Sequence, residues 1–105
     1  GRPWCIGKGF EHSAPIGPVH PKATTGELLQ GAITLDVNGQ RRQTGDLKDL
    51  IWSVNETIAT LSRAWTLQPG DLIYTGTPEG VAAVVKGDTL VGGIDGLGEL
   101  RVKVN

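Results

Sequence analysis

One stretch in the last third of the chain organises the rest: Asp71-Leu72-Ile73-Tyr74-Thr75-Gly76-Thr77-Pro78-Glu79-Gly80-Val81. Residues 72–75 are bulky apolar or β-branched, which predicts a half-buried strand. The strand ends at Gly76, because glycine allows backbone angles closed to other residues and Pro78 fixes φ and has no amide proton. The hydroxyls of Thr75 and Thr77, with free amides beside them, suit a carboxylate or carbonyl oxygen. The alternative is a tight loop between strands that binds nothing.

The length and composition indicate one small domain rich in β structure. The chain has 105 residues, enough for one core with little to spare. Its 16 glycines, with one phenylalanine and one tyrosine, are typical of short strands joined by tight turns. We therefore expect a single α+β domain over residues 1–105, with a core made by Val, Ile, Leu and the three tryptophans.

Charge and cysteine content restrict the partners and the compartment. Ten basic and eleven acidic residues give a net charge of −1, without the basic face that nucleic-acid binding needs. No apolar stretch approaches the ~20 residues of a membrane helix. The single Cys5 has no internal disulfide partner, which fits a reducing compartment. We expect a soluble cytoplasmic protein that binds neither nucleic acid nor membrane.

Residues 32–44 carry a hairpin signal. Apolar and polar residues alternate through residues 33–37, and Asn38-Gly39 supplies the residues of a type I′ turn. The returning strand, residues 40–44, has no apolar side. Its outer face meets water, a partner subunit or a charged ligand, and water is the expectation.

Residues 47–65 are the main helical region. Ser53 and Glu56 match a capping box, which predicts that the helix begins at Val54. Apolar residues then recur at helical spacing, which predicts a buried stripe packed on the sheet. The members of this stripe are Val54, Ile58, Leu61 and Trp65.

The remaining segments give weaker signals. Residues 1–10 are expected to form a loop or irregular strand, and the prolines in residues 14–21 predict an extended segment with little pairing. Residues 22–30 are ambiguous, with one helical turn opening near Thr24 and ending by Gly31. Further strands are predicted at residues 81–85, 89–93 and 97–104.

Few titratable side chains are marked for chemistry by the residues alone. His12 and His20 lack the close spacing of a metal pair, and Cys5 has no evident base beside it. Lys8 lies between two glycines and close to apolar residues, which predicts that it turns inward and meets an anion. A solvated loop lysine is the alternative. Glu11, Glu79 and Asp95 complete the set of candidates.

Taken together, several short motifs resemble the fumarylacetoacetate hydrolase family, and its fumarylpyruvate hydrolase and acylpyruvase branch in particular. They occur in the family's order and spacing along the whole chain: Ile6-Gly7-Lys8-Gly9-Phe10, Ser13-Ala14-Pro15-Ile16-Gly17-Pro18, Asp36-Val37-Asn38-Gly39, Leu67-Gln68-Pro69-Gly70-Asp71, Thr75-Gly76-Thr77-Pro78 and Gly93-Ile94-Asp95-Gly96-Leu97-Gly98. The resemblance implies the C-terminal part of a mixed β-roll with one packed helix.

The resemblance also implies an activity. Similar enzymes cleave a carbon–carbon bond in acylpyruvates such as fumarylpyruvate, with Mg²⁺ or Mn²⁺ holding the α-keto acid end, in the breakdown of aromatic compounds. The lysine that matches Lys8 stabilises the developing enolate charge. The threonine that matches Thr77 contacts the substrate carboxylate, and Gly76 and Thr75 shape the same end of the site.

The chain departs from the family pattern in its metal ligands. A Glu-x-Glu pair, an aspartate and a His–Glu dyad precede the lysine in the family, and none of them is present here. Glu11 and Asp95 match no ligand position. We therefore expect a partial enzyme that binds no metal alone and forms a homo-oligomer through its uncovered apolar surface. The alternative is a non-catalytic dimerisation module from a shortened reading frame. The absence of methionine, even at position 1, fits a piece of a longer protein or removal of the initiator.

Overall fold

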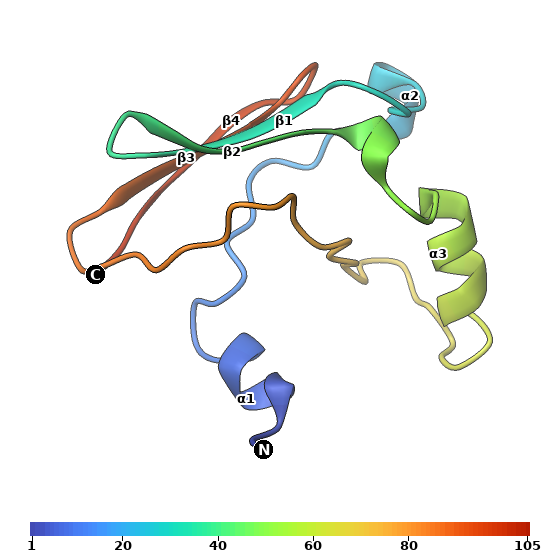
Figure 1. Cartoon of the computed structure of the whole chain (residues 1–105). Coiled ribbons are helices and arrows are strands. Elements are labelled where there is room, and N and C mark those ends of the chain that lie inside the picture. The colour runs from blue at the N-terminus through green and yellow to red at the C-terminus, as the bar shows by residue number, and fades with distance from the viewer.

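The computed structural model describes all residues 1–105 and contains one four-stranded antiparallel sheet with short helices at its periphery (Figure 1). The strand order is β2-β1-β3-β4. The predicted α+β class is confirmed. The strands are β1 (Ala32–Val37), β2 (Gln40–Asp46), β3 (Thr89–Ile94) and β4 (Gly98–Lys103).

The β1–β2 hairpin forms as the sequence predicts. Asn38 and Gly39 both have positive φ, 51° and 79°, as a type I′ turn requires. The Asn38 side chain also ties the turn to β3, because its Nδ2 donates to Asp88 Oδ1 (2.8 Å) and its Oδ1 accepts from the Thr89 amide (2.9 Å). These bonds fix the register of the sheet at this end.

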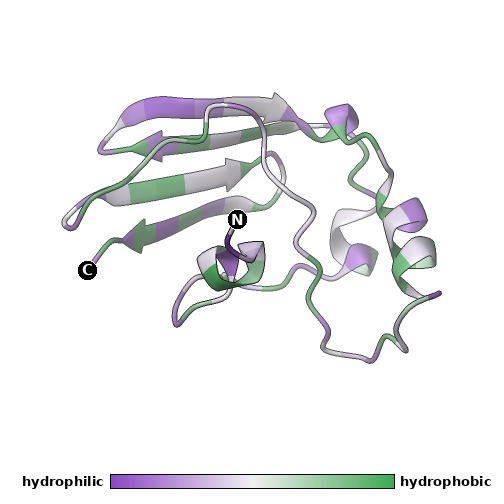
Figure 2. Ribbon diagram, turned by 60° about the horizontal axis from the view of Figure 1, so that its bottom comes forward, coloured by the Kyte–Doolittle hydropathy of each residue, from purple (hydrophilic) through white to green (hydrophobic).

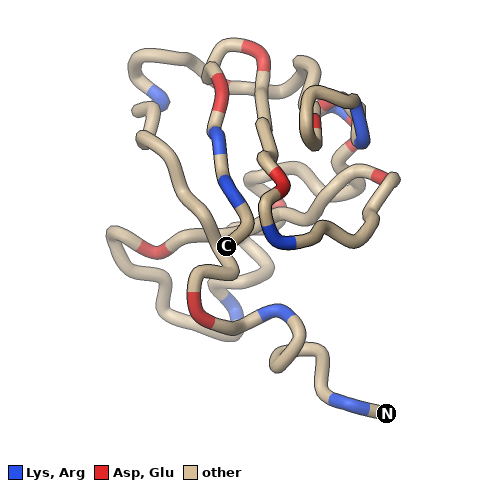
Figure 3. Tube along the Cα trace, turned by 90° about the vertical axis from the view of Figure 1, so that its left-hand side faces the viewer, with Lys and Arg blue, Asp and Glu red and all other residues tan.

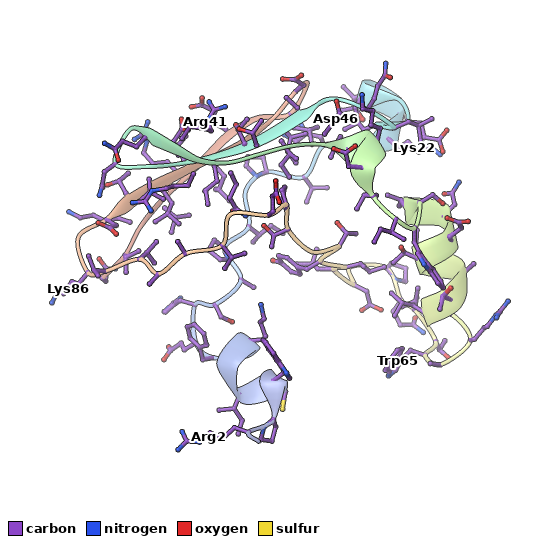
Figure 4. All side chains as sticks on the ribbon, viewed as in Figure 1. Arg2, Lys22, Arg41, Asp46, Trp65 and Lys86 are labelled. Atoms are coloured by element: carbon purple, nitrogen blue, oxygen red, sulfur yellow. The ribbon has the colours of Figure 1, made fainter.

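Helix α3 (Val54–Leu61) begins where the capping box places it. The Ser53 hydroxyl accepts from the Glu56 amide (3.1 Å), and the Glu56 carboxylate accepts from the Ser53 amide (2.8 Å). The predicted buried stripe is wrong within this chain, since Val54 is 50% exposed and Trp65 is 64% exposed. The helix lies beyond one end of the sheet and not over its face, and Trp65 points away from the sheet (Figures 1 and 4).

The N-terminal segment differs from the prediction of a loop or irregular strand. Residues Trp4–Lys8 form the short helix α1, which Gly9 closes through its amide on the Cys5 carbonyl (2.7 Å). Helix α2 (Lys22–Thr25) is the single turn that was predicted nearby. It begins directly after Pro21 and ends at Gly26, whose φ is 72°, so it ends earlier than predicted. The 3-10 turn η1 spans Leu47–Asp49, and residues 14–21 are extended and unpaired, as predicted.

The strands predicted at residues 72–75 and 81–85 do not form, whereas β3 and β4 confirm the other two. Both unpaired segments belong to the connection that runs beneath the sheet (Figure 1). They do not lie along a sheet edge, where backbone groups would find a partner. Their β-branched and apolar composition is typical of a strand on a half-buried surface, whereas all of these residues are exposed in this chain.

The core is open. Val37 (5% exposed) and Gln43 (9% exposed) are the only buried residues. The radius of gyration is 15.1 Å, against about 13 Å for a compact domain of this length. Hydrophobic and hydrophilic residues alternate along the strands (Figure 2), so one sheet face is apolar and has little of this chain over it.

Charge is dispersed over the molecule. Acidic and basic residues are interspersed along the chain (Figure 3), and Arg41 on the outer sheet face donates to Asp36. Arg41 and Asp46 point away from the segments beneath the sheet (Figure 4). None of the helices has the length and apolar character needed to cross a membrane.

Candidate functional site

An apolar groove of about 710 Å³ lies between the inner face of the sheet and the two segments that pass beneath it. Residues 13–20 and residues 74–78 form its lower walls, and the two segments are joined where Tyr74 Oη donates to the Ala14 carbonyl (3.3 Å). The apolar side chains of the sheet that line the groove are Ile33, Leu35, Leu90, Ile94, Leu100 and Val102. Gln43 and Thr77 are polar residues on its wall.

The loop that carries Thr77 is docked closely on β2. A Cβ atom added to Gly80, whose φ is 98°, would lie 2.7 Å from the Arg42 carbonyl oxygen. A Cβ atom added to Gly45 would lie 3.0 Å from the Pro78 ring. Only glycine fits at Gly80, because both the backbone angle and the lack of space exclude a side chain.

Gln43 fixes the same loop through its side-chain amide. Its Nε2 atom lies 2.7 Å from the Pro78 carbonyl, 3.0 Å from Thr77 Oγ1 and 3.3 Å from the Glu79 carbonyl. Gln43 thus lies on the inner face of the sheet, whereas the expectation of solvent concerned the outer face of residues 40–44. The sequence did not signal this position, because a two-residue turn with uninterrupted pairing places Arg42 opposite Leu35, and the β-bulge between Leu35 and Asp36 brings Gln43 there in its place.

Of the predicted substrate-binding residues, Thr77 lines the groove, and Thr75 and Gly76 precede it in the same loop. The amide groups of Thr75, Gly76 and Thr77 donate to no acceptor within the 105 residues. Gly76 has a φ of 96° and open space around its Cβ position. Three free amides next to a threonine hydroxyl form a set of donors that suits an anionic oxygen.

Lys8 is not brought to this wall. It is the last residue of α1, is exposed, makes no ion pair and does not line the groove. Helix α1 lies away from the sheet (Figure 1). The prediction that Lys8 turns inward is wrong for this arrangement, because α1 replaces the expected loop.

The other candidates do not form a catalytic or metal centre. His20 lines the groove, whereas His12 lies 3.7 Å from Glu11 on the exposed surface, and Cys5 is exposed. No group of three or more His, Cys, Asp or Glu side chains occurs that is able to hold a metal ion. A divalent ion that prefers several oxygen ligands is therefore not matched by the donors of this chain alone.

Three carboxylates have a lowered pKa, and each of them accepts hydrogen bonds at a turn or a helix end. The amides of Lys48 and Gly31 donate to Asp46 and hold its pKa below the usual value. The Ser53 amide and hydroxyl lower the pKa of Glu56, and the Val85 amide and Asn38 side chain lower that of Asp88. All three shifts arise from hydrogen bonds to the charged form, and none of these carboxylates lines the groove.

Comparison with known proteins identifies the family. The family model described as the C-terminal part of fumarylacetoacetate (FAA) hydrolase matches residues 1–105. The chain belongs to the fumarylacetoacetate hydrolase family. Among its curated relatives, a fumarylpyruvate hydrolase from Ralstonia sp. is 49% identical over 104 residues, which are 99% of this chain and 54% of the relative. The mitochondrial oxaloacetate tautomerase FAHD1 of Rattus norvegicus is 40% identical over 99% of this chain and 47% of the relative.

The fold of this family member agrees with a solved structure. The fumarylpyruvate hydrolase from Pseudomonas aeruginosa, in complex with Mn²⁺ and pyruvate, superposes with a TM-score of 0.94 at 56% identity. The match covers 98% of this chain and 44% of that protein. The chain thus spans about half the length of the relatives that it matches.

Proposed function

We propose that this chain is the C-terminal part of a metal-dependent hydrolase that cleaves a carbon–carbon bond in acylpyruvates such as fumarylpyruvate. Family membership and the similarity to fumarylpyruvate hydrolases support this function. The observation that carries it is the loop Thr75-Gly76-Thr77, whose amides donate to no acceptor within the 105 residues and whose Thr77 lines the apolar groove. A donor set for a carboxylate next to an apolar wall fits an α-keto acid that bears an acyl group.

The loop binds and orients the carboxylate end of the substrate. The Thr77 hydroxyl and the neighbouring amides donate to the carboxylate oxygens, and such charge-assisted bonds are stronger than neutral ones. The acyl chain then lies along the sheet face, against side chains such as Leu35 and Leu90. This placement aligns the bond between the acyl carbon and the pyruvate C3 atom for attack.

Hydrolysis adds one water across that bond. The water oxygen bonds to the acyl carbonyl carbon, the carbon–carbon bond breaks, and its electron pair passes to the pyruvate fragment as an enolate. Protonation at C3 then gives pyruvate, and the acyl fragment leaves as a carboxylate. A cation near the enolate oxygen lowers the cost of this charge, and we assign that role to Lys8 from the family resemblance, since the geometry of the 105 residues does not bring it to the groove.

The residues of this chain do not form the metal site, so we assign no step to the ion. Mg²⁺ or Mn²⁺ would be held by acidic residues elsewhere in the polypeptide. The open apolar sheet face is covered in the same assembly by the remainder of the polypeptide and by a second copy, which makes the enzyme a homo-oligomer in the cytoplasm.

The test uses the complete polypeptide that contains this chain, with Mn²⁺ and an acylpyruvate. Thr77→Val removes the hydroxyl without changing the size of the side chain and is expected to raise KM at least about tenfold. Lys8→Ala is expected to lower kcat by about 10²-fold or more. Lys86→Ala is the matched control, because Lys86 lies on an exposed turn at the far end of the sheet (Figure 4).

Three results would argue against the proposal. Lack of turnover with any acylpyruvate would favour the non-catalytic dimerisation module. Conversion of oxaloacetate between its keto and enol forms, without hydrolysis of acylpyruvates, would place the protein with the tautomerase relatives. Equal loss of activity in Lys8→Ala and Lys86→Ala would remove Lys8 from the site.

A further inference from the structure

Gln43 is a buried polar residue on a strand that is otherwise largely exposed. It is 9% exposed, and it contacts the loop through one atom, Nε2, which lies within hydrogen-bond distance of three oxygens. Two of these oxygens are backbone carbonyls, of Pro78 and Glu79, which only accept hydrogen bonds. The amide group must therefore present its NH₂ side to the loop.

This orientation decides how the Thr77 hydroxyl is used. An amide nitrogen does not accept a hydrogen bond, so Thr77 Oγ1 is the acceptor of the 3.0 Å bond from Gln43. The hydroxyl proton of Thr77 has no acceptor among the 105 residues. The hydroxyl is thus left with a proton that it is able to donate into the groove.

We propose that Gln43 is a positioning residue that sets the Thr77 hydroxyl as a donor to the carboxylate of the substrate. The inference rests on the proposed function, because it assumes that Thr77 binds a carboxylate. Gln43 acts on the carboxylate through Thr77, to which its Nε2 atom donates. Its bonds to Pro78 and Glu79 serve a separate purpose, since they dock the loop on β2 whether or not Thr77 has a hydroxyl.

The two purposes are separated by a double-mutant cycle in the complete polypeptide. The probe is pyruvate in the presence of Mn²⁺, and its Kd is measured by calorimetry. Gln43→Met keeps the length of the side chain but removes the donor, and Gln43→Glu replaces the donor with an ionised acceptor. The hydroxyl of Thr77 would then donate to Glu and not to the ligand. Gln40→Met is the matched control, because Gln40 is an exposed glutamine on the same strand.

Both Gln43 variants are expected to weaken pyruvate binding about tenfold or more while Thr77 is present. In a Thr77→Val background Gln43→Met is expected to alter the Kd less than about twofold, although Tm still falls because the bonds to Pro78 and Glu79 are lost. Thr77→Ser keeps the hydroxyl and is expected to restore the full effect of Gln43→Met. If either Gln43 variant fails to fold, Gln43→Asn, which keeps the NH₂ group on a shorter side chain, completes the cycle.

Equal effects of Gln43→Met on the Kd in both backgrounds would overturn the inference and leave the proposed function in place, since Gln43 would then only dock the loop. An unchanged Kd in the Gln43 variants would also overturn it. If the unmodified protein binds no pyruvate, or if Thr77→Val binds it normally, the proposed role of Thr77 fails and the inference fails with it.

Discussion

Replacing Gly80 by alanine is expected to destabilise the protein by about 2–5 kcal/mol. Its φ of 98° lies where a Cβ atom costs about 1–2 kcal/mol. That Cβ atom would lie 2.7 Å from the Arg42 carbonyl oxygen, and Arg42 lies within β2, whose backbone is held by β1. The loop must move instead of the strand, which breaks the bonds from Gln43 to Pro78 and Glu79, each worth about 0.5–1.5 kcal/mol.

Gly87→Ala isolates the close contact, because Gly87 has nearly the same φ, 95°, and no atom within 4 Å of its Cβ position. The free energy of unfolding from urea titration of the complete polypeptide is the measurement. Gly87→Ala is expected to lose only the cost of its backbone angle, so the two variants should differ by about 1–3 kcal/mol. Pyruvate affinity should fall in Gly80→Ala alone. Equal destabilisation by the two changes would refute the close docking of the loop on β2.

Three further results are expected. Glu56→Gln should destabilise the protein near neutral pH, and the effect should become smaller as the pH falls below about 4.5. The hydrogen bonds from Ser53 that lower the pKa of Glu56 stabilise only the ionised carboxylate. Unfolding as a function of pH is the measurement, and Glu99→Gln is the control. Asn38→Ala should cost about 1–3 kcal/mol in urea unfolding, since it loses two hydrogen bonds at a positive φ, while the exposed Asn55→Ala on α3 should cost less than about 0.5 kcal/mol. Removal of metal with EDTA should abolish acylpyruvate hydrolysis, and Mn²⁺ should restore it; turnover that persists without metal would contradict the proposed chemistry.

Local signals predicted the elements that local interactions determine. The Asn38-Gly39 turn and the capping box of Ser53 and Glu56 satisfy backbone groups within a few residues, so their outcome depends little on the rest of the chain. The alternation of residues 98–103 likewise predicted β4. Helix α1 was missed because its five residues, Trp4–Lys8, include a glycine and lie between two more.

Signals that depend on distant partners failed. Residues 72–75 and 81–85 have the composition of strands, but a ladder needs a second strand that these 105 residues do not place beside them. The burial of Ile58 and the inward position of Lys8 depend in the same way on what covers α3 and α1. Gln43 was missed because it reaches the inner face through a β-bulge, which the alternation of the hairpin did not predict.

The apolar inner face of the sheet is both the open core and one wall of the groove. Ile33, Leu35 and Val102 line the groove, and none of them is fully buried, because only the two segments of residues 13–20 and 74–78 pass beneath the inner face of the sheet. Burial of such side chains supplies most of the stability of a domain. Whatever covers this face must therefore bury the core and close the groove together. Substitution of a groove residue such as Leu35 is thus expected to change both stability and acyl-group preference. A change at Gln43 should separate the two, because its bond to Thr77 concerns the ligand and its bonds to Pro78 and Glu79 concern the fold.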